Sequence, residues 1–342
     1  MYYLTYRPKT IEEIDNSIPR EIIKKILSAK SLPHAFLFVG QKGTGKTSTA
    51  RIFAKSVNCL KRAPSSVEPC NSCANCKSID HSSFPDVVEM DAASNRGINE
   101  VKNLIKESSF LPIAGTYRVF IIDEAHMITN DGFNALLKTL EEPPATVIFI
   151  LATTNAEKIP KTIASRCISV VFGKAKKNEI IHMLDRIVKS EKLHIDTKIL
   201  DLIASHSDNS FRDGAKLLEE LVIQKKLEYD QVQSYIGVRS KDNLLQILSI
   251  KPLSASLEWI SEFSQTGGSF KNLIEELLSQ LHMQLLSKHD IDKIENINLS
   301  LFEITMLMKL LNEAYINLRN TPIESIPLEI AVVEFYNKKV SK

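Results

Sequence analysis

The stretch GQKGTGKT, residues 40–47, constrains the fold of this chain more than any other feature. It fits the spacing G-x-x-x-x-G-K-[ST], with Gly40, Gly45, Lys46 and Thr47 at the defining positions. An apolar run, AFLFV, precedes it, and a helical pattern, TSTARIFAKSV, follows it. Glycines let such a loop wrap closely around phosphates, so that backbone N–H groups and the helix N-terminus face the anion. This context favours a phosphate-binding loop between a strand and a helix over an ordinary glycine-rich turn.

Short apolar runs alternate with helical patterns over the first half of the chain. The runs are rich in Val, Ile and Phe with little polar alternation, which is typical of strands buried on both faces. They cover residues 35–40, 86–91, 118–123, 146–153 and 168–172. Among the helical patterns, FNALLKTLEEPP has one apolar stripe and ends at two prolines. Strands that alternate with helices predict a parallel sheet with helices on both faces.

The strand signal stops after Phe172, and the remainder of the chain is predicted to be helical. Amphipathic stretches cover residues 177–193, 197–226 (with a break near Ser207–Ser210), 270–288, 301–319 and 327–339. We therefore expect a nucleotide-binding domain at residues 1–173, a small helical domain at 174–238 and an all-α domain at 239–342.

Composition narrows the class of protein. Of 342 residues, 44% are hydrophobic and 25% charged, as in a globular protein. A formal net charge of +2 argues neither for nor against nucleic acid, so any DNA-binding surface would be a local patch. The N-terminus, MYYLTYRPKT, has no signal-peptide core, and runs such as VIFILA are too short to span a bilayer. We expect a cytoplasmic protein.

The candidate catalytic residues fall in two motifs. In the phosphate loop, Lys46 would neutralise the β- and γ-phosphates and Thr47 would ligate Mg²⁺. In VFIIDEAH, Asp123 ends a buried strand, at the edge where open parallel sheets bind ligands, and can hold Mg²⁺ directly or through water. The adjacent Glu124 can orient or deprotonate the attacking water. Taken alone, this acidic pair also fits a solvated strand end.

Polar residues follow the next strand, and two isolated arginines lie further on. Thr153, Thr154 and Asn155 are placed either to contact a γ-phosphate or simply to cap the strand end. Arg166 in SRC and Arg212 in SFRDG are, on the residues alone, compatible with surface salt bridges.

Four of the five cysteines cluster as Cys59-x10-Cys70-x2-Cys73-x2-Cys76. In a reducing cytosol such a cluster indicates a metal site rather than disulfides. Four thiolates form a closed tetrahedral site, the arrangement of structural zinc, which leaves no coordination position for catalysis. An iron–sulfur cluster and redox thiols are the alternatives. We interpret Cys167 as a buried packing residue.

Several segments together resemble a known family. In order they are YRPKTIEEI, HAFLFVGQKGTGKTSTARIFAKSVNC, the C-x2-C-x2-C run, DAASNRGINEV, IIDEAHMITNDGFNALLKTLEEPP, FILATTNAEKIPKTIASRC and SFRDGAKLL. They resemble the bacterial DNA polymerase III gamma/tau subunits, the ATPases of the sliding-clamp loader. The match is dense over residues 1–215. The resemblance implies an α/β P-loop NTPase domain of the AAA+ class, a helical lid domain and an all-α oligomerisation collar. It also supports zinc at the four cysteines.

The resemblance assigns roles to the residues left ambiguous above. Thr154 matches the sensor-1 position, and Arg212 matches sensor 2, which contacts nucleotide in the same subunit. Arg166 matches the arginine finger, which reaches the ATP of a neighbouring subunit. Arg7 and Pro8 match the segment near the adenine. The implied nucleotide-binding residues are Arg7, Gly40, Gly43, Gly45, Lys46, Thr47, Ser48, Thr154 and Arg212, and the implied catalytic residues are Lys46, Asp123, Glu124 and Arg166.

The resemblance also implies cofactors and partners. The cofactors are ATP, Mg²⁺ and Zn²⁺. The partners are delta- and delta-prime-type subunits in a pentameric ring, the sliding clamp and primer–template DNA, within a DNA-directed DNA polymerase holoenzyme. The candidate DNA contacts are Asn95, Arg96, Lys102, Lys161 and Thr162. Contacts of this kind to phosphates position a protein without reading sequence, and each residue is equally compatible with a solvated surface position.

The sequence departs from the family pattern in two places. DNSIP, residues 15–19, replaces the usual Val-Gly-Gln segment, which affects the expected adenine contacts. The chain stops at Lys342, without the long tau-type extension, so we expect a gamma-like product.

Two other functions compete with the loader ATPase. A non-hydrolysing delta-prime-type scaffold conflicts with the intact GTGKT and DEAH, and a hexameric branch-migration helicase conflicts with the cysteines and SRC.

Overall fold

The computed structural model describes residues 1–63, 66–95, 97–236, 244–250, 252–265, 269–288 and 299–340. The chain divides into two compact units, Met1–Lys225 and Lys226–Lys342. The predicted boundary between residues 238 and 239 lies outside the described residues.

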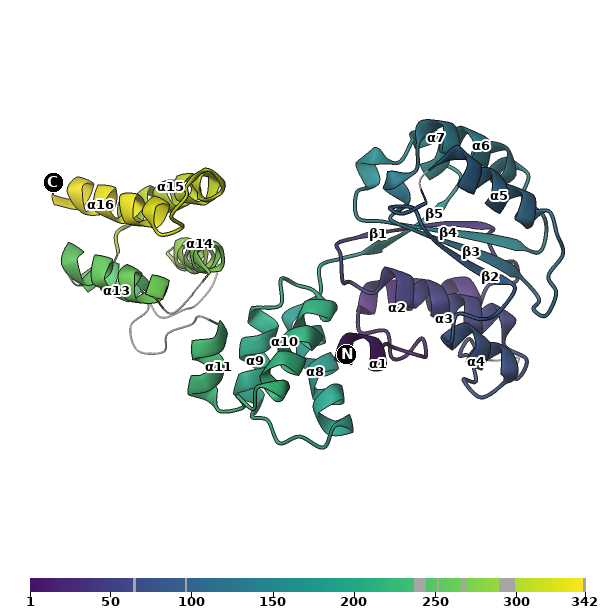
Figure 1. The fold of residues 1–342 in the computed structure, drawn as a ribbon, viewed down its shortest axis with the longest axis horizontal. Helices are drawn as coiled ribbons and strands as arrows, with labels where there is room; N and C mark the ends of the chain where they lie inside the picture. Colours follow the sequence, from purple (N-terminus) through teal and green to yellow (C-terminus); the bar gives the residue numbers. More distant parts are fainter. Residues whose placement is uncertain are drawn as a thin grey trace. The chain divides into compact units, whose positions relative to one another are not determined.

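The first unit is built on a parallel sheet whose strand order is β2-β3-β4-β1-β5 (Figure 1). Its strands are β1 (Ala35–Gly40), β2 (Val87–Asp91), β3 (Arg118–Asp123), β4 (Val147–Thr153) and β5 (Ile168–Phe172). All five predicted strands are confirmed, within one residue at each end. The register places Val39 beside Thr153, so the carboxyl ends of β1, β3 and β4 lie at one edge of the sheet. That edge carries the phosphate loop.

Helices cover both faces of this sheet, as the sequence predicts. Alternate residues of β1 point to opposite faces. Phe36 and Phe38 enter a core shared with α2 and α3, and Ala35 and Leu37 enter a core shared with α5, α6 and α7 (Figure 1). The helices of this unit are α1 (Tyr2–Thr5), α2 (Ser17–Leu27), α3 (Lys46–Asn58), α4 (Ala74–Asp80), α5 (Ile98–Ser108), η1 (Ala125–Met127), α6 (Asn130–Glu141), η2 (Ala156–Lys158), α7 (Lys161–Ala164), α8 (Lys177–Ser190), α9 (Thr197–Ser205) and α10 (Phe211–Ile223).

Burial on both faces, predicted for all the strands, holds only in the middle of the sheet. Every residue of β4 is buried, whereas β2 and β5 are edge strands. Ile168 and Val171 of β5 are 42% and 54% exposed, although Val170 and Phe172 of the same strand are buried. An apolar run cannot by itself distinguish a central strand from an edge strand, because strand order is a tertiary property.

Helices α8, α9 and α10 lie within the span predicted for the lid, residues 174–238, and belong to the first compact unit; we refer to these three helices as the lid. Helix α11 (Tyr229–Ile236) lies in the same predicted span but belongs to the second unit. The predicted break in the helical pattern is confirmed between α9 and α10. There Asp208 and Asn209 have positive φ angles of 47° and 54°. The Ser210 side chain then accepts a hydrogen bond from the Asp213 backbone N–H at 3.3 Å and so caps α10. Helix α10 therefore begins directly beside the phosphate loop. There the Gly43 carbonyl accepts a hydrogen bond from the Phe211 N–H.

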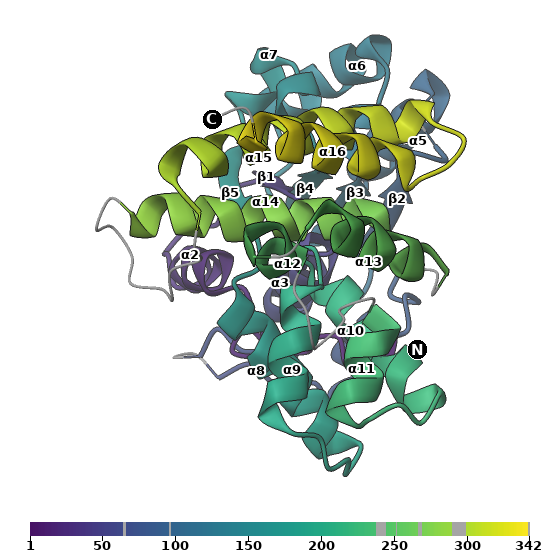
Figure 2. The same ribbon diagram turned by 90° about the vertical axis from the view of Figure 1, so that its left-hand side faces the viewer.

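The second unit is helical throughout its described residues and has its own apolar core. Its helices are α11 (Tyr229–Ile236), α12 (Leu244–Ile250), α13 (Leu253–Gln265), α14 (Phe270–Ser287), α15 (Leu301–Asn317), η3 (Leu318–Asn320) and α16 (Ile326–Val340). The three long helices α14, α15 and α16 lie side by side (Figure 2). Their core includes Ile274, Leu311 and Phe335. The three helical stretches predicted here, at 270–288, 301–319 and 327–339, are confirmed, and α11, α12 and α13 are additional helices. No helix within the described ranges is both long and apolar enough to cross a membrane.

Candidate nucleotide-binding site and cysteine cluster

Two glycines give the phosphate loop its conformation. Gly43 and Gly45 have φ angles of 79° and 96°, in the region that side chains disfavour. A Cβ atom on Gly43 would also lie 2.0 Å from the Ser210 hydroxyl, and one on Gly40 would lie 2.4 Å from the Phe172 carbonyl oxygen. Glycine at these positions therefore allows the loop to curve tightly and to pack closely against β5 and the lid.

Lys46 is the buried cation of the loop, with 6% of its surface exposed. Its ammonium donates to the carbonyl oxygens of Gly40 at 2.9 Å and Gln41 at 2.8 Å. Burial lowers the pKa of Lys46, while the nearby Asp123 and Glu124 act in the opposite direction. A desolvated ammonium with replaceable carbonyl partners is well placed to transfer its hydrogen bonds to phosphate oxygens.

The two predicted Mg²⁺ ligands lie together. Thr47 is the second residue of α3 and Asp123 the last of β3, and the Thr47 hydroxyl donates to Asp123 Oδ2 at 2.6 Å. A hydroxyl and a carboxylate beside a phosphate loop are the oxygen ligands that Mg²⁺ prefers. The donor set therefore fits the ion.

Glu124 is held in place by contacts from the neighbouring strand. Its backbone is left-handed, with a φ of 47°, and its N–H donates to Asp123 Oδ1 at 2.9 Å. The Thr154 hydroxyl donates to Glu124 Oε2 at 3.2 Å. His126 Nδ1 lies 3.5 Å from the same oxygen and 3.1 Å from the Thr153 hydroxyl. Sequence reasoning did not select His126, although it stands two residues after Glu124 in the same motif.

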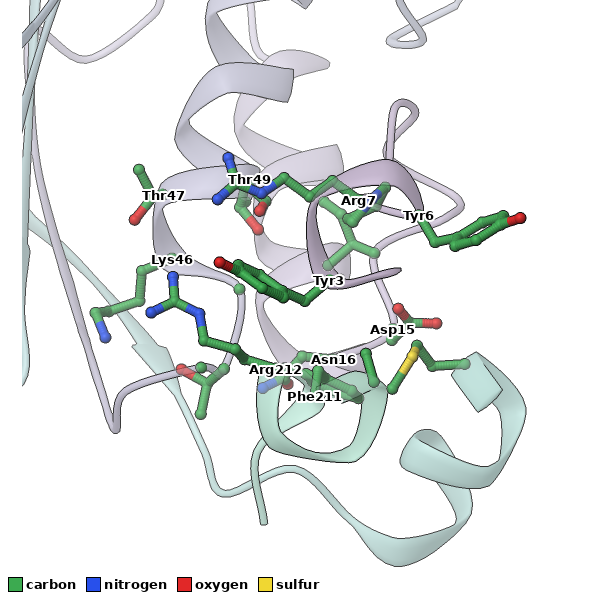
Figure 3. A pocket seen from close by; sticks show the side chains of 18 of the residues that line it. Tyr3, Tyr6, Arg7, Asp15, Asn16, Lys46, Thr47, Thr49, Phe211 and Arg212 are labelled. Atoms are coloured by element: carbon green, nitrogen blue, oxygen red, sulfur yellow. The ribbon is translucent and has the colours of Figure 1, made fainter. Parts of the chain in front are cut away.

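A pocket brings most of the predicted nucleotide-binding residues together (Figure 3). Its lining includes Arg7, Gly43, Gly45, Lys46, Thr47, Ser48, Asp123, Glu124 and Arg212. Thr154 does not line the pocket itself, but it donates a hydrogen bond to Glu124, which does. Gly40, the first residue of the loop, packs closely against Phe172 of β5 and is also outside the lining. Burial, followed by the charges of Arg51 and Arg212, lowers the pKa of Arg7. Arg7 and Arg212 both line the pocket, so a bound anion would face both guanidinium groups.

The N-terminal segment supplies pocket residues that sequence reasoning missed. Tyr2, Tyr3 and Tyr6 line the pocket beside Pro8, which the family resemblance already places in the segment near the adenine. Their only signal in the sequence is the cluster of aromatic residues in MYYLTYRP.

The atypical segment at residues 15–19 also reaches the pocket, through Asp15 and Asn16. The Asp15 carboxylate is 6% exposed and pairs with Arg186 of α8 at 2.9 Å. The Asn16 amide donates to the Gly173 carbonyl at 3.2 Å. These contacts join the N-terminal segment to the lid.

Arg166 lies apart from this pocket. It is exposed at the end of α7, where its guanidinium donates to the Thr162 carbonyl at 2.6 Å and pairs with Glu141 of α6. Cys167, the next residue, is half-buried rather than buried, and it packs against the core beneath α6 and α7. Burial raises the pKa of its thiol to about 11, so it remains protonated near neutral pH.

Four of the five candidate DNA contacts are exposed side chains. They are Asn95, Lys102, Lys161 and Thr162. Asn95 donates through its side-chain amide to the Asp91 carbonyl at 3.2 Å, and Lys161 and Thr162 begin α7. Arg96 lies outside the described residues.

The four predicted cysteine ligands come together. The sulfur atoms of Cys59, Cys70, Cys73 and Cys76 all lie within 4.8 Å of one another. Three of these sulfur atoms accept a hydrogen bond from a backbone N–H group. Cys70 N–H donates to Cys59 Sγ at 3.3 Å, Cys73 N–H to Cys70 Sγ at 3.3 Å, and Cys76 N–H to Cys73 Sγ at 3.4 Å. Such donors stabilise metal-bound thiolates. The cluster is therefore compatible with one tetrahedral metal ion.

Lys55 ties this cluster to the helix that follows the phosphate loop. Its side chain is 1% exposed, and its ammonium lies 2.8 Å from both Asp80 and Asn71. Because Asn71 lies between two of the cysteines, the cluster and α3 are joined by a buried charge.

A parallel sheet in the order β2-β3-β4-β1-β5, a phosphate loop and a helical lid over one pocket define a P-loop protein of the AAA+ class. Solved structures of Thermotoga maritima RuvB, including one titled a Holliday junction branch migration motor, are similar in fold. The TM-score is 0.50 at 17% identity, over 76% of this chain and 86% of RuvB. At that identity the similarity concerns the fold alone.

Sequence comparisons place the chain within this class. A family profile described as "DNA polymerase III, delta subunit" matches residues 16–176. DNA polymerase III subunit tau of Bacillus subtilis is 41% identical over 84% of this chain and 52% of its own length. DNA polymerase III subunit gamma of Buchnera aphidicola subsp. Baizongia pistaciae is 37% identical over 81% of this chain and 76% of its own length. The chain belongs to the DNA polymerase III gamma/tau subunit family. It spans about half the length of the Bacillus protein.

Proposed function

We propose that this chain is an ATPase motor subunit of a sliding-clamp loader, which uses ATP to place the clamp on primed DNA. One observation carries the ATPase assignment. The Thr47–Asp123 hydrogen bond and the Glu124–Thr154 hydrogen bond lie side by side at the carboxyl edge of the sheet, next to Lys46. A degraded phosphate-binding scaffold would have no need to keep all five groups in this arrangement.

Each group has a distinct task in hydrolysis. Lys46 and the loop N–H groups hold the β- and γ-phosphates, and Arg212 approaches them from the lid. Thr47 and Asp123 would hold Mg²⁺, which neutralises charge on the phosphate oxygens. Glu124 accepts a proton from the attacking water, and Thr154 orients both Glu124 and the γ-phosphate. Gly43 and Gly45 allow the backbone to curve closely around the phosphates.

Arg166 is proposed to act on the ATP of a neighbouring subunit. Its exposure and its place outside the chain's own pocket support this assignment. Such an arginine makes hydrolysis depend on correct assembly, because it stabilises transition-state charge only across a formed interface. The proposed partners are delta- and delta-prime-type subunits in a pentameric ring, the clamp and primer–template DNA. We propose that the complex acts in the cytoplasm. Asn95, Arg96, Lys102, Lys161 and Thr162 stay candidates for backbone contacts to DNA.

Substituting the proposed general base tests the ATPase assignment. Glu124→Gln removes the proton acceptor but keeps the shape of the side chain. We expect turnover to fall about 10²- to 10⁴-fold with ATP binding retained. The measurement is phosphate release by the reconstituted loader, stimulated by clamp and primer–template DNA. Glu157→Gln, an exposed residue after β4, serves as the control. Full turnover by Glu124→Gln would refute the assignment.

We propose zinc as the ion at the cysteine cluster, since four thiolates close a tetrahedral site. Elemental analysis should then find about one zinc per chain. Cys73→Ser should lose the metal and keep nucleotide binding, because the cluster is separate from the pocket. Cys167→Ser is the matched control and should keep the metal. Iron in place of zinc, or a metal that survives Cys73→Ser, would contradict this assignment.

A further inference from the structure

The ring of Tyr3 lies against two cations of the lid. Arg212 and Lys216 stand four residues apart on α10 and so share one face of the helix. The Arg212 guanidinium carbon and the Lys216 ammonium nitrogen each lie 5.7 Å from the centre of the Tyr3 ring. Figure 3 shows the ring beside the Arg212 side chain, on the pocket side of α1. Both distances are within the range of a cation–π interaction.

Residues before and after Tyr3 in the sequence form hydrogen bonds with the lid. The Tyr2 N–H donates to Glu219 Oε2 of α10 at 3.1 Å. The Tyr6 hydroxyl donates to Glu191 Oε1, at the end of α8, at 2.5 Å. These bonds hold the ring in place independently of any ligand in the pocket.

Arg212 shares the pocket with other cations. Lys46 and Arg7 line it with Arg212, together with the carboxylates of Asp15, Asp123 and Glu124. The charge of Arg212 acts against the charges of Arg7 and Lys46, and a long arginine side chain gains conformational freedom by moving into solvent. The face of an aromatic ring carries partial negative charge and attracts a guanidinium without adding an anion that would compete with phosphate.

We infer that Tyr3 is the positioning residue of Arg212: it holds the guanidinium over the phosphate loop before nucleotide binds. This inference rests on the proposed function. An arginine that is already placed loses less conformational entropy on binding, so affinity for the triphosphate rises. The role belongs to the π face of the ring and not to its hydroxyl. Direct stacking of Tyr3 on the base is the competing role.

The first experiment measures ATP binding to the full chain by calorimetry with Mg²⁺. Tyr3→Leu should weaken binding about threefold to tenfold, the range expected for loss of a cation–π contact. Tyr3→Phe keeps the ring and should stay close to wild type. Equal losses in Tyr3→Leu and Tyr3→Phe would overturn the inference. If wild type and Tyr3→Phe both fail to bind ATP, the proposed function itself is wrong.

A double-mutant cycle separates positioning from direct stacking. Arg212→Met is measured alone and combined with Tyr3→Leu. If Tyr3 acts through Arg212, the double variant binds ATP as the Arg212→Met variant does. If the two losses add, Tyr3 contacts the nucleotide directly and the inference is overturned.

Fluorinated rings give a test that leaves the fold undisturbed. Phenylalanines with one, two and three ring fluorines at position 3 weaken the π face progressively with little change of shape. We expect ATP affinity to fall in step with the number of fluorines. A flat series overturns the inference, whatever the stability of the Tyr3→Leu variant.

Discussion

Arg166→Ala is expected to reduce ATP turnover by the assembled loader about 10³- to 10⁵-fold, the range for removal of an arginine finger. The same variant, as an isolated chain, should bind ATP as wild type does. The reason is geometric: Arg166 is exposed beside Glu141 and does not line the chain's own pocket. We therefore expect the guanidinium to have no part in holding the chain's own nucleotide.

This expectation is checked by two measurements on one variant. Calorimetry on the isolated chain reports its own ATP binding, and phosphate release by the reconstituted complex reports turnover. Arg62→Ala, an exposed arginine near the cysteine cluster, is the control and should change neither. Loss of ATP binding by the isolated Arg166→Ala chain would show that the arginine acts within its own subunit.

Lys46→Ala is expected to abolish nucleotide binding, with a loss of at least about 100-fold in affinity. Lys46 is the buried cation of the phosphate loop, and its ammonium donates hydrogen bonds to two backbone carbonyl groups. Charge-assisted hydrogen bonds to phosphate are among the strongest polar contacts in proteins. Alanine removes them, and Lys42, the other cation of the loop, is exposed and does not take the buried position of the Lys46 ammonium.

The binding isotherm of the full chain with ATP and Mg²⁺ measures this loss. Lys30→Ala, an exposed lysine ahead of β1, should bind as wild type does. The melting temperature should change little, because the two lost hydrogen bonds involve carbonyl groups that water can reach once the side chain is gone. Retained ATP affinity in Lys46→Ala would refute the assignment of the loop.

Local features were predictable to within one residue. Asp123 ends a strand because a buried apolar run stops there, and Gly43 and Gly45 adopt positive φ because a glycine has no Cβ atom to oppose it. The four cysteines meet because short spacings bring their sulfur atoms together. In each case neighbouring residues in the chain carry the physical cause.

Edge strands and the N-terminal tyrosines were not predictable in this way. Ile168 and Val171 read as core residues, yet they are exposed because β5 has a single neighbouring strand. Tyr3 gave no signal of a role, since its partners Arg212 and Lys216 lie more than two hundred residues away along the chain.

The sequence by itself determined the chemistry of this protein: a phosphate loop, an acidic strand end, a cysteine cluster and a parallel sheet to carry them. These depend on spacing and on periodic burial, which short segments encode. Only the tertiary structure decided which distant groups meet, such as Thr154 with Glu124, Asp15 with Arg186 and Tyr3 with Arg212. Those contacts follow from how the lid and the N-terminal segment pack on the sheet, and packing depends on the shapes of whole surfaces rather than on any local pattern.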